Sequence, residues 1–137
     1  MMAKARIAVV GAGLMGHGIA QVFALAGHEV KITDTVVKNL DTVASRIAAN
    51  LRDLGEDERA VERVQPSVDL TDAVHDADYV VEAVSENLEL KKKLIAELER
   101  RTRAAALASS PRSRRLAAMR GTAVARFSAT VSVIVTS

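Results

Sequence analysis

The chain has 137 residues, of which 49% are hydrophobic, 26% are charged and only 2% are aromatic, and its formal net charge is +2 at pH 7. This composition predicts a single globular domain with an aliphatic core. Because the chain contains no cysteine, a disulfide framework and a thiolate metal site are excluded, and we identify no other set of metal ligands.

No stretch of the sequence resembles a signal peptide, and no apolar run reaches the ~20 residues of a membrane-spanning helix. We therefore expect a soluble, cytoplasmic protein without a membrane partner.

The first predicted elements are a strand, a glycine-rich turn and a helix. The apolar, β-branched run from Ile7 to Val10 predicts a buried strand. Apolar residues recur at helical spacing between positions 19 and 26, and Gly27 ends the helix. Residues 11–16 lie between these two elements and have the spacing G-x-G-x-x-G, so the glycines fall in a strand-to-helix turn.

Each glycine of this turn has a distinct physical role in binding a dinucleotide. Gly11 allows the tight turn, Gly13 lets a pyrophosphate approach the backbone, and Gly16 lets the helix pack close to the strand. The N–H groups at the start of the helix then face the phosphates. We expect the cofactor to contact Gly11, Ala12, Gly13, Leu14, Met15 and Gly16.

A second strand, from Glu29 to Thr33, ends at Asp34, which lies 18 residues after Gly16. A carboxylate at this spacing binds the ribose hydroxyls of the adenosine and repels a 2′-phosphate, which favours NAD over NADP. FAD-binding proteins begin with the same turn, so the motif alone does not separate NAD from FAD. The structural alternative is a glycine turn in which Asp34 only caps a helix.

Two helical segments follow. Apolar residues at helical spacing predict an amphipathic helix from Val36 to about Gly55. The charged segment from Glu56 to Val64 predicts a second, short helix, so the two would form a helical hairpin. Such a hairpin is either an ordinary crossover between strands or a binding element.

The next elements continue the alternation of strands and helices. Residues 64–70 predict a short strand interrupted by Pro66, which marks either an edge strand or the start of a strand. Residues 71–78 predict a polar connector with about one helical turn. Residues 79–84 predict a core strand, and residues 88–101 a helix. The predicted fold is therefore α/β, with a doubly wound, mainly parallel sheet.

Two of these segments resemble the NAD-binding domain of the 3-hydroxyacyl-CoA dehydrogenase family. They read GAGLMGHGIAQVFALAGHEV at residues 11–30 and DADYVVEAVSENLELKKKL at residues 76–94. The resemblance covers about residues 4–100 and includes Asp34 and the hairpin. It implies a Rossmann-type domain, NAD as cofactor, and oxidation of an acyl-CoA-type substrate in fatty acid metabolism, with hydride passing to NAD.

The resemblance also implies further site residues. Glu86 and Lys91 match an acid and a lysine that contact the nicotinamide side of the cofactor. Positions that help to hold coenzyme A in relatives match Asn50 and the acidic stretch near Asp57, although an acid does not suit a CoA phosphate. Ser113 matches the serine of an ASNTSS-like segment.

We identify no catalytic residue, because the family's HFFNP-like segment, which carries its catalytic histidine, is not found in this sequence. The three histidines, His17, His28 and His75, lie in turns or connectors and are expected to face solvent.

Residues 1–100 are predicted to form the NAD-binding domain, and residues 101–137 an Arg/Ala/Ser-rich tail that is not a separate domain. All 17 acidic residues precede residue 100, and eight arginines follow from there on. A frameshift or truncation would explain this change, and the coding DNA would test it. A nucleic-acid-binding tail is the alternative, but Phe127 is its only aromatic residue, so no such partner is expected. Within the tail, residues 130–136 have the composition of a strand that either adds to the sheet edge or, with no acid nearby, promotes aggregation.

Three interpretations of function remain. The first is the NAD-binding domain of a 3-hydroxyacyl-CoA dehydrogenase, incomplete and inactive because the helical C-terminal domain, which forms the family's homodimer, is expected to be absent. The second is a non-catalytic NAD-binding module. The third is a related Rossmann dehydrogenase of the gulonate or hydroxyisobutyrate type.

Overall fold

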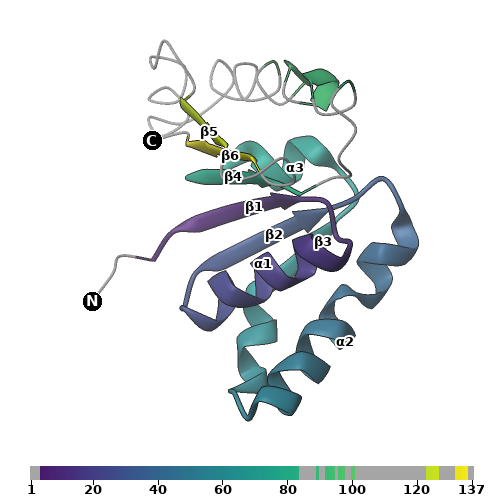
Figure 1. Ribbon diagram of the computed structural model, residues 1–137, viewed down its shortest axis with the longest axis vertical. Helices are drawn as coiled ribbons and strands as arrows, with labels where there is room; N and C mark the ends of the chain where they lie inside the picture. Colours follow the sequence, from purple (N-terminus) through teal and green to yellow (C-terminus); the bar gives the residue numbers. More distant parts are fainter. Residues whose placement is uncertain are drawn as a thin grey trace.

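The structure is a computed structural model that describes residues 4–83, residues 89, 92–94, 96, 97 and 100, and the backbone of residues 123–126 and 132–135. Its elements, drawn in Figure 1, are β1 (Arg6–Val10), α1 (Leu14–Leu25), β2 (Glu29–Thr33), α2 (Val37–Leu54), η1 (Glu58–Arg63), β3 (Val64–Ser67), α3 (Leu70–His75), β4 (Tyr79–Glu82), β5 (Ala123–Arg126) and β6 (Ser132–Val135).

The strands form a six-stranded sheet in the order β3-β2-β1-β4-β6-β5. The first four of these are parallel, whereas β6 pairs antiparallel with both β4 and β5. This arrangement confirms the predicted mainly parallel, Rossmann-type sheet. The strands β2 and β4 lie on opposite sides of β1, so the connections that follow β1 and β3 run in opposite directions across the sheet. This change of direction creates a crevice at the carboxyl ends of the strands.

The central strand β1 is buried on both faces. Ile7 and Val9 pack in one cluster with the apolar residues of α1 and α2, whereas Ala8 and Val10 pack in another with Val74 of α3. Figure 1 shows α1 and α2 on one side of the sheet and α3 on the other. Because neighbouring side chains of a strand point to opposite faces, a strand covered on both sides must be apolar throughout.

The helix α2 confirms the predicted amphipathic segment. It buries a stripe of apolar side chains at helical spacing and ends at Gly55, whose φ of 70° is left-handed. The second arm of the predicted hairpin is a six-residue 3-10 helix, η1, rather than an α-helix. The cap at Asp57 and the start of β3 at Val64 leave only six residues for this arm, and short connectors between elements often take 3-10 geometry.

The remaining elements refine the predicted boundaries. The strand β3 ends at Ser67 and lies at the sheet edge, where Pro66 is tolerated. The helix α3 begins after Asp69, whose side chain accepts a hydrogen bond from the Thr71 N–H at 2.9 Å. The described positions of the predicted 88–101 segment, beginning at residue 89, are helical.

The tail contributes two strands to the same sheet. The predicted strand at residues 130–136 is found as β6, but it lies between β4 and β5 rather than at the edge, and β5 was not predicted. Within the described residues, no helix combines the length and the apolar character needed to cross a membrane.

We expect Gly16→Ala to destabilise the protein by at least about 1–3 kcal/mol, the usual cost of overpacking. A Cβ at Gly16 would lie 1.7 Å from the carbonyl oxygen of Gly11, so the turn or the helix must move. The matched control is Gly18→Ala in the same helix, where a Cβ meets no atom within 4 Å. This control should gain about 0.5–1 kcal/mol because alanine is the better helix former. Urea unfolding measures both variants, and equal stabilities would contradict the close packing.

Candidate functional site

The turn between β1 and α1 has the geometry that a dinucleotide-binding turn requires. Gly11 has a φ of 109°, a conformation that other residues rarely adopt, and its N–H donates to the Thr33 carbonyl at 2.7 Å. The carbonyl of Gly11 lies against Gly16, so α1 starts in direct contact with the turn. A Cβ at Gly13 would meet nothing within 4 Å. The backbone at Gly13 is therefore open to a ligand that a side chain would displace.

The first turn of α1 is available to bind an anion. Its N-cap is Gly13, which provides no side-chain cap, and no acidic residue lies in the first turn. The side chains of Leu14 and Met15 are 84% and 49% exposed. With neither a side-chain cap nor an acid, the first-turn N–H groups and the positive end of the helix dipole remain to interact with an anion beside the glycines.

Asp34 lies at the end of β2 and is tied to the same turn. Its Oδ2 accepts hydrogen bonds from the Ala12 N–H at 2.8 Å and from the Asn39 side chain at 3.1 Å. Its Oδ1 accepts from the Val36 N–H at 2.8 Å. Burial alone raises the pKa of Asp34, but these hydrogen bonds together outweigh burial and bring the pKa below its ordinary value. Asp34 is therefore an ionised acceptor next to the turn.

A cleft of about 440 Å³ opens beside the turn and Asp34. It lies at the carboxyl ends of the parallel strands, where ligands bind in open α/β sheets. Gly11, Gly13 and Asp34 form its polar side. Its apolar side is formed by Val36, Val68, Leu70 and Leu94. This combination of bare backbone, a carboxylate and an apolar wall matches the phosphates, ribose and base of a dinucleotide.

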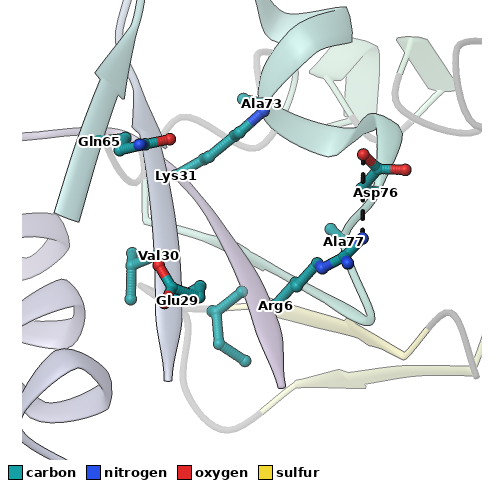
Figure 2. Close-up of a pocket in the computed structure, with 9 residues that line it drawn as sticks. Arg6, Glu29, Val30, Lys31, Gln65, Ala73, Asp76 and Ala77 are labelled. Atoms are coloured by element: carbon teal, nitrogen blue, oxygen red, sulfur yellow. Dashed lines mark ion pairs between the residues drawn. The ribbon is translucent and has the colours of Figure 1, made fainter. Parts of the chain in front are cut away.

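A second hollow, of about 260 Å³, lies at the opposite ends of the strands (Figure 2). It is lined by the first residues of β1 and β2 and by the end of α3, and the Arg6–Asp76 ion pair of 3.9 Å lies at its border. In parallel sheets these amino-terminal ends do not form the ligand crevice. The cleft next to Gly13 is therefore the candidate site.

Three of the predicted site residues, Glu86, Lys91 and Ser113, lie outside the described residues. Asn50 is described and lies half-buried between α1 and α2. Its Nδ2 is 3.1 Å from His17 Nε2 and 3.1 Å from Gln21 Oε1, so its amide group is engaged within the protein. A contact between Asn50 and substrate stays a prediction.

Asp57, near the second position matched to coenzyme A, serves as the cap of η1. It accepts hydrogen bonds from the backbone and the side chain of Arg59. The Arg59 side chain is the main cause of the lowered pKa of this carboxyl. Its negative charge is therefore paired locally.

The expectation that the histidines face solvent is wrong for two of the three. His17 and His28 are each only 7% exposed. The Nδ1 of His17 is 2.9 Å from the Gly13 carbonyl, and the Nδ1 of His28 accepts the Ala5 N–H at 3.0 Å. These contacts tie each ring to the backbone of a neighbouring segment, a tertiary effect that turn position does not reveal. None of the three histidines lines the cleft.

Sequence reasoning missed two residues next to the turn, Asn39 and Arg46. Arg46 donates to the carbonyls of Ala12 at 2.6 Å and Asn39 at 3.0 Å, and Asn39 also donates to Asp34. The available signal is the helical spacing of positions 39, 46 and 50, which places three polar side chains on one side of the apolar stripe of α2.

Replacing Asp34 with Asn should remove part of the stability at neutral pH, because the ionised carboxylate accepts three hydrogen bonds. The folded pKa of Asp34 is lowered, so its contribution is present above the unfolded pKa and is lost as the pH falls through the folded value. The difference in unfolding free energy between wild type and Asp34→Asn should therefore shrink below about pH 4. Other carboxylates titrate in both proteins and cancel. Urea unfolding across a pH series measures this difference in unfolding free energy. A difference that does not change with pH would contradict the lowered pKa of Asp34.

The family model for "3-hydroxyacyl-CoA dehydrogenase, NAD binding domain" matches residues 6–128, and so extends past residue 100, where the resemblance recognised in the sequence ends. The human mitochondrial hydroxyacyl-coenzyme A dehydrogenase is 35% identical over 107 residues, covering 69% of this chain and 34% of the relative. The 3-hydroxyadipyl-CoA dehydrogenase of Escherichia coli K12 is 39% identical over 100 residues, covering 67% of this chain and 21% of the relative.

Among solved structures, the 3-hydroxybutyryl-CoA dehydrogenase of Escherichia coli K12 superposes with a TM-score of 0.66 at 37% identity. The match covers 73% of this chain and 23% of that protein. This chain thus spans about a third or less of the length of these relatives. The turn, the acid at the end of β2 and these matches agree, and the chain belongs to the 3-hydroxyacyl-CoA dehydrogenase family, as its NAD-binding domain.

Proposed function

We propose that the turn from Gly11 to Gly16 binds the pyrophosphate of NAD and that Asp34 binds the adenosine ribose. The observation that carries this proposal is the contrast between two glycines of one turn. A Cβ at Gly16 would overlap the Gly11 carbonyl unless the turn or the helix moved, whereas the space at Gly13 is open and faces the cleft. An open glycine next to uncapped helix N–H groups suits a phosphate.

The adenosine half of the cofactor fits the remaining features of the cleft. The carboxylate of Asp34 retains free lone pairs after accepting its three hydrogen bonds, so it can also accept from ribose hydroxyls. The side chains of Val36 and Val68 are 52% and 74% exposed beside it and offer an apolar surface to the base. An ionised acid here disfavours the 2′-phosphate of NADP. Glu86 and Lys91 are proposed for the nicotinamide side.

We further propose that the domain serves an oxidoreductase that acts on 3-hydroxyacyl-CoA. The names of the relatives support this substrate class, since one acts on a hydroxyadipyl-CoA and another on a hydroxybutyryl-CoA. In such a reaction NAD accepts the hydride. The domain is proposed to comprise residues 1–100. The pairing of β6 with β4 supports the view that residues 101–137 do not form a separate domain.

The alternative is a module that binds NAD without catalysis. The observation that favours it is the placement of the histidines. His17 and His28 are buried and contact backbone groups. None of the three histidines lines the cleft, so none is placed to take the proton of a substrate hydroxyl.

Gly13→Val should abolish most of the affinity for NADH while the protein stays folded. Gly13 has a φ of −76° and open space at its Cβ, so valine fits the fold but blocks the phosphates. We expect NADH binding, followed by its fluorescence, to weaken by more than about tenfold, which is about 1.4 kcal/mol. Gly18→Ala, also in open space, should bind like wild type. Unchanged affinity in Gly13→Val would place the cofactor elsewhere.

A turnover assay tests whether this chain is catalytic by itself. The 137-residue chain is first titrated with NADH and then assayed for NADH-dependent reduction of acetoacetyl-CoA at 340 nm. Because no histidine of the chain lines the cleft, we expect NADH binding with little or no reduction. Reduction at the rate of a complete dehydrogenase, with matching loss of NADH, would show that the chain holds its own proton donor and would refute the non-catalytic alternative.

A further inference from the structure

The side chain of Arg46 reaches from α2 to the backbone of the glycine turn. Its Nη2 donates to the Ala12 carbonyl at 2.6 Å and to the Asn39 carbonyl at 3.0 Å, and the residue is half-buried. Its Nη1 is 3.3 Å from the ring of His17, which is itself held by the Gly13 carbonyl. The guanidinium is therefore fixed between α1, α2 and the turn.

The protein holds the successive peptide groups of the turn one by one. The N–H of Gly11 donates to Thr33, and the N–H of Ala12 donates to Asp34. The carbonyl of Ala12 accepts from Arg46, and the carbonyl of Gly13 accepts from the backbone N–H and the ring of His17. The hydrogen bonds of the described residues include no acceptor for the N–H of Gly13 or of Leu14.

The orientation of these last two N–H groups follows from the planarity of the peptide bond. In a trans peptide the carbonyl and the next N–H point in opposite directions, and the described chain contains no cis peptide. The bond from Arg46 to the Ala12 carbonyl therefore directs the Gly13 N–H away from α2. Gly13 lines the cleft, so this is the donor that a phosphate there would meet.

Glycine makes such an anchor necessary. Gly11 and Gly13 lack a Cβ, so the backbone before and after Ala12 is weakly restricted and the Ala12–Gly13 peptide group has more than one accessible orientation. A hydrogen bond from a charged guanidinium is stronger than one from a neutral donor, and it selects one of these orientations before the ligand arrives.

We propose that Arg46 is a positioning residue for the cofactor, which fixes the Ala12–Gly13 peptide so that the Gly13 N–H faces the pyrophosphate. This inference rests on the proposed function, in which the turn binds NAD. Arg46 itself acts through the backbone and not by contact with the ligand.

The test compares three variants of the full chain with two ligands. Arg46→Met keeps the aliphatic stem and removes the donors, Arg46→Lys keeps charge and donor, and Arg52→Met is the matched control on α2, where Arg52 pairs with Glu58 on the surface. NADH carries the pyrophosphate, whereas adenosine reaches only the Asp34 side and is measured by ligand-observed NMR.

Arg46→Met should weaken NADH binding about tenfold, a loss within the range of one hydrogen bond to a charged group. Its affinity for adenosine should stay at the wild-type value. Arg46→Lys should recover most of the NADH affinity, and Arg52→Met should bind both ligands like wild type. If Arg46→Met does not fold, Arg46→Gln, which keeps a shorter, uncharged side chain, is measured for the same difference between ligands.

Wild-type NADH affinity in Arg46→Met would overturn the proposal while leaving the proposed function intact. Equal losses for NADH and adenosine, together with a lower melting temperature, would also overturn it, because they would assign Arg46 a general structural role. Absence of NADH binding by the wild-type chain is a separate result, which would refute the proposed function and this inference with it.

Discussion

The contact between the start of α1 and the glycine turn is the constraint on which the rest of the structure depends. The carbonyl of Gly11 occupies the place of a side chain at Gly16, so the helix begins directly on the end of β1. This closeness directs the uncapped N–H groups of α1 toward the carboxyl ends of the strands. It also requires a positive φ at Gly11, which only glycine adopts at little cost. The open backbone at the start of α1 is thus a consequence of how the first strand and helix pack.

Other elements stabilise this turn from three directions. Thr33 and Asp34 hold it from the end of β2, His17 holds it from α1, and Arg46 holds it from α2. Each of these contacts is a hydrogen bond to the turn backbone, and together they leave the side that faces the cleft without a partner in the described chain. A loop of small residues has high conformational entropy, so such bonds are needed to present it in one conformation. The loop is therefore built as a preorganised site, and its rigidity comes from residues outside the motif.

The glycine turn and Asp34 lie together at one cleft, and the histidines of the chain do not line it. The glycine turn and Asp34 belong to the first two strand–helix units, which the described residues contain in full. A dehydrogenase that oxidises an alcohol also needs a base within hydrogen-bond distance of the hydroxyl. His17 and His28 hold backbone groups, and neither lines the cleft. The described residues therefore supply the features of a dinucleotide-binding site, whereas none of the three histidines lies in the cleft beside it.

By itself, the sequence determined the alternation of strands and helices, the glycine turn, the acid after β2 and the end of α2 at Gly55. These features depend on local properties, namely apolar periodicity and the conformational freedom of glycine, which a single segment carries. Only the tertiary structure decided the burial of His17 and His28, the engagement of Asn50 and the contact of Arg46 with the turn. It also decided that η1 is a 3-10 helix and that β6 lies antiparallel beside β4. These outcomes depend on hydrogen bonds and pairings between residues far apart in the chain, and no local pattern records which distant groups will meet.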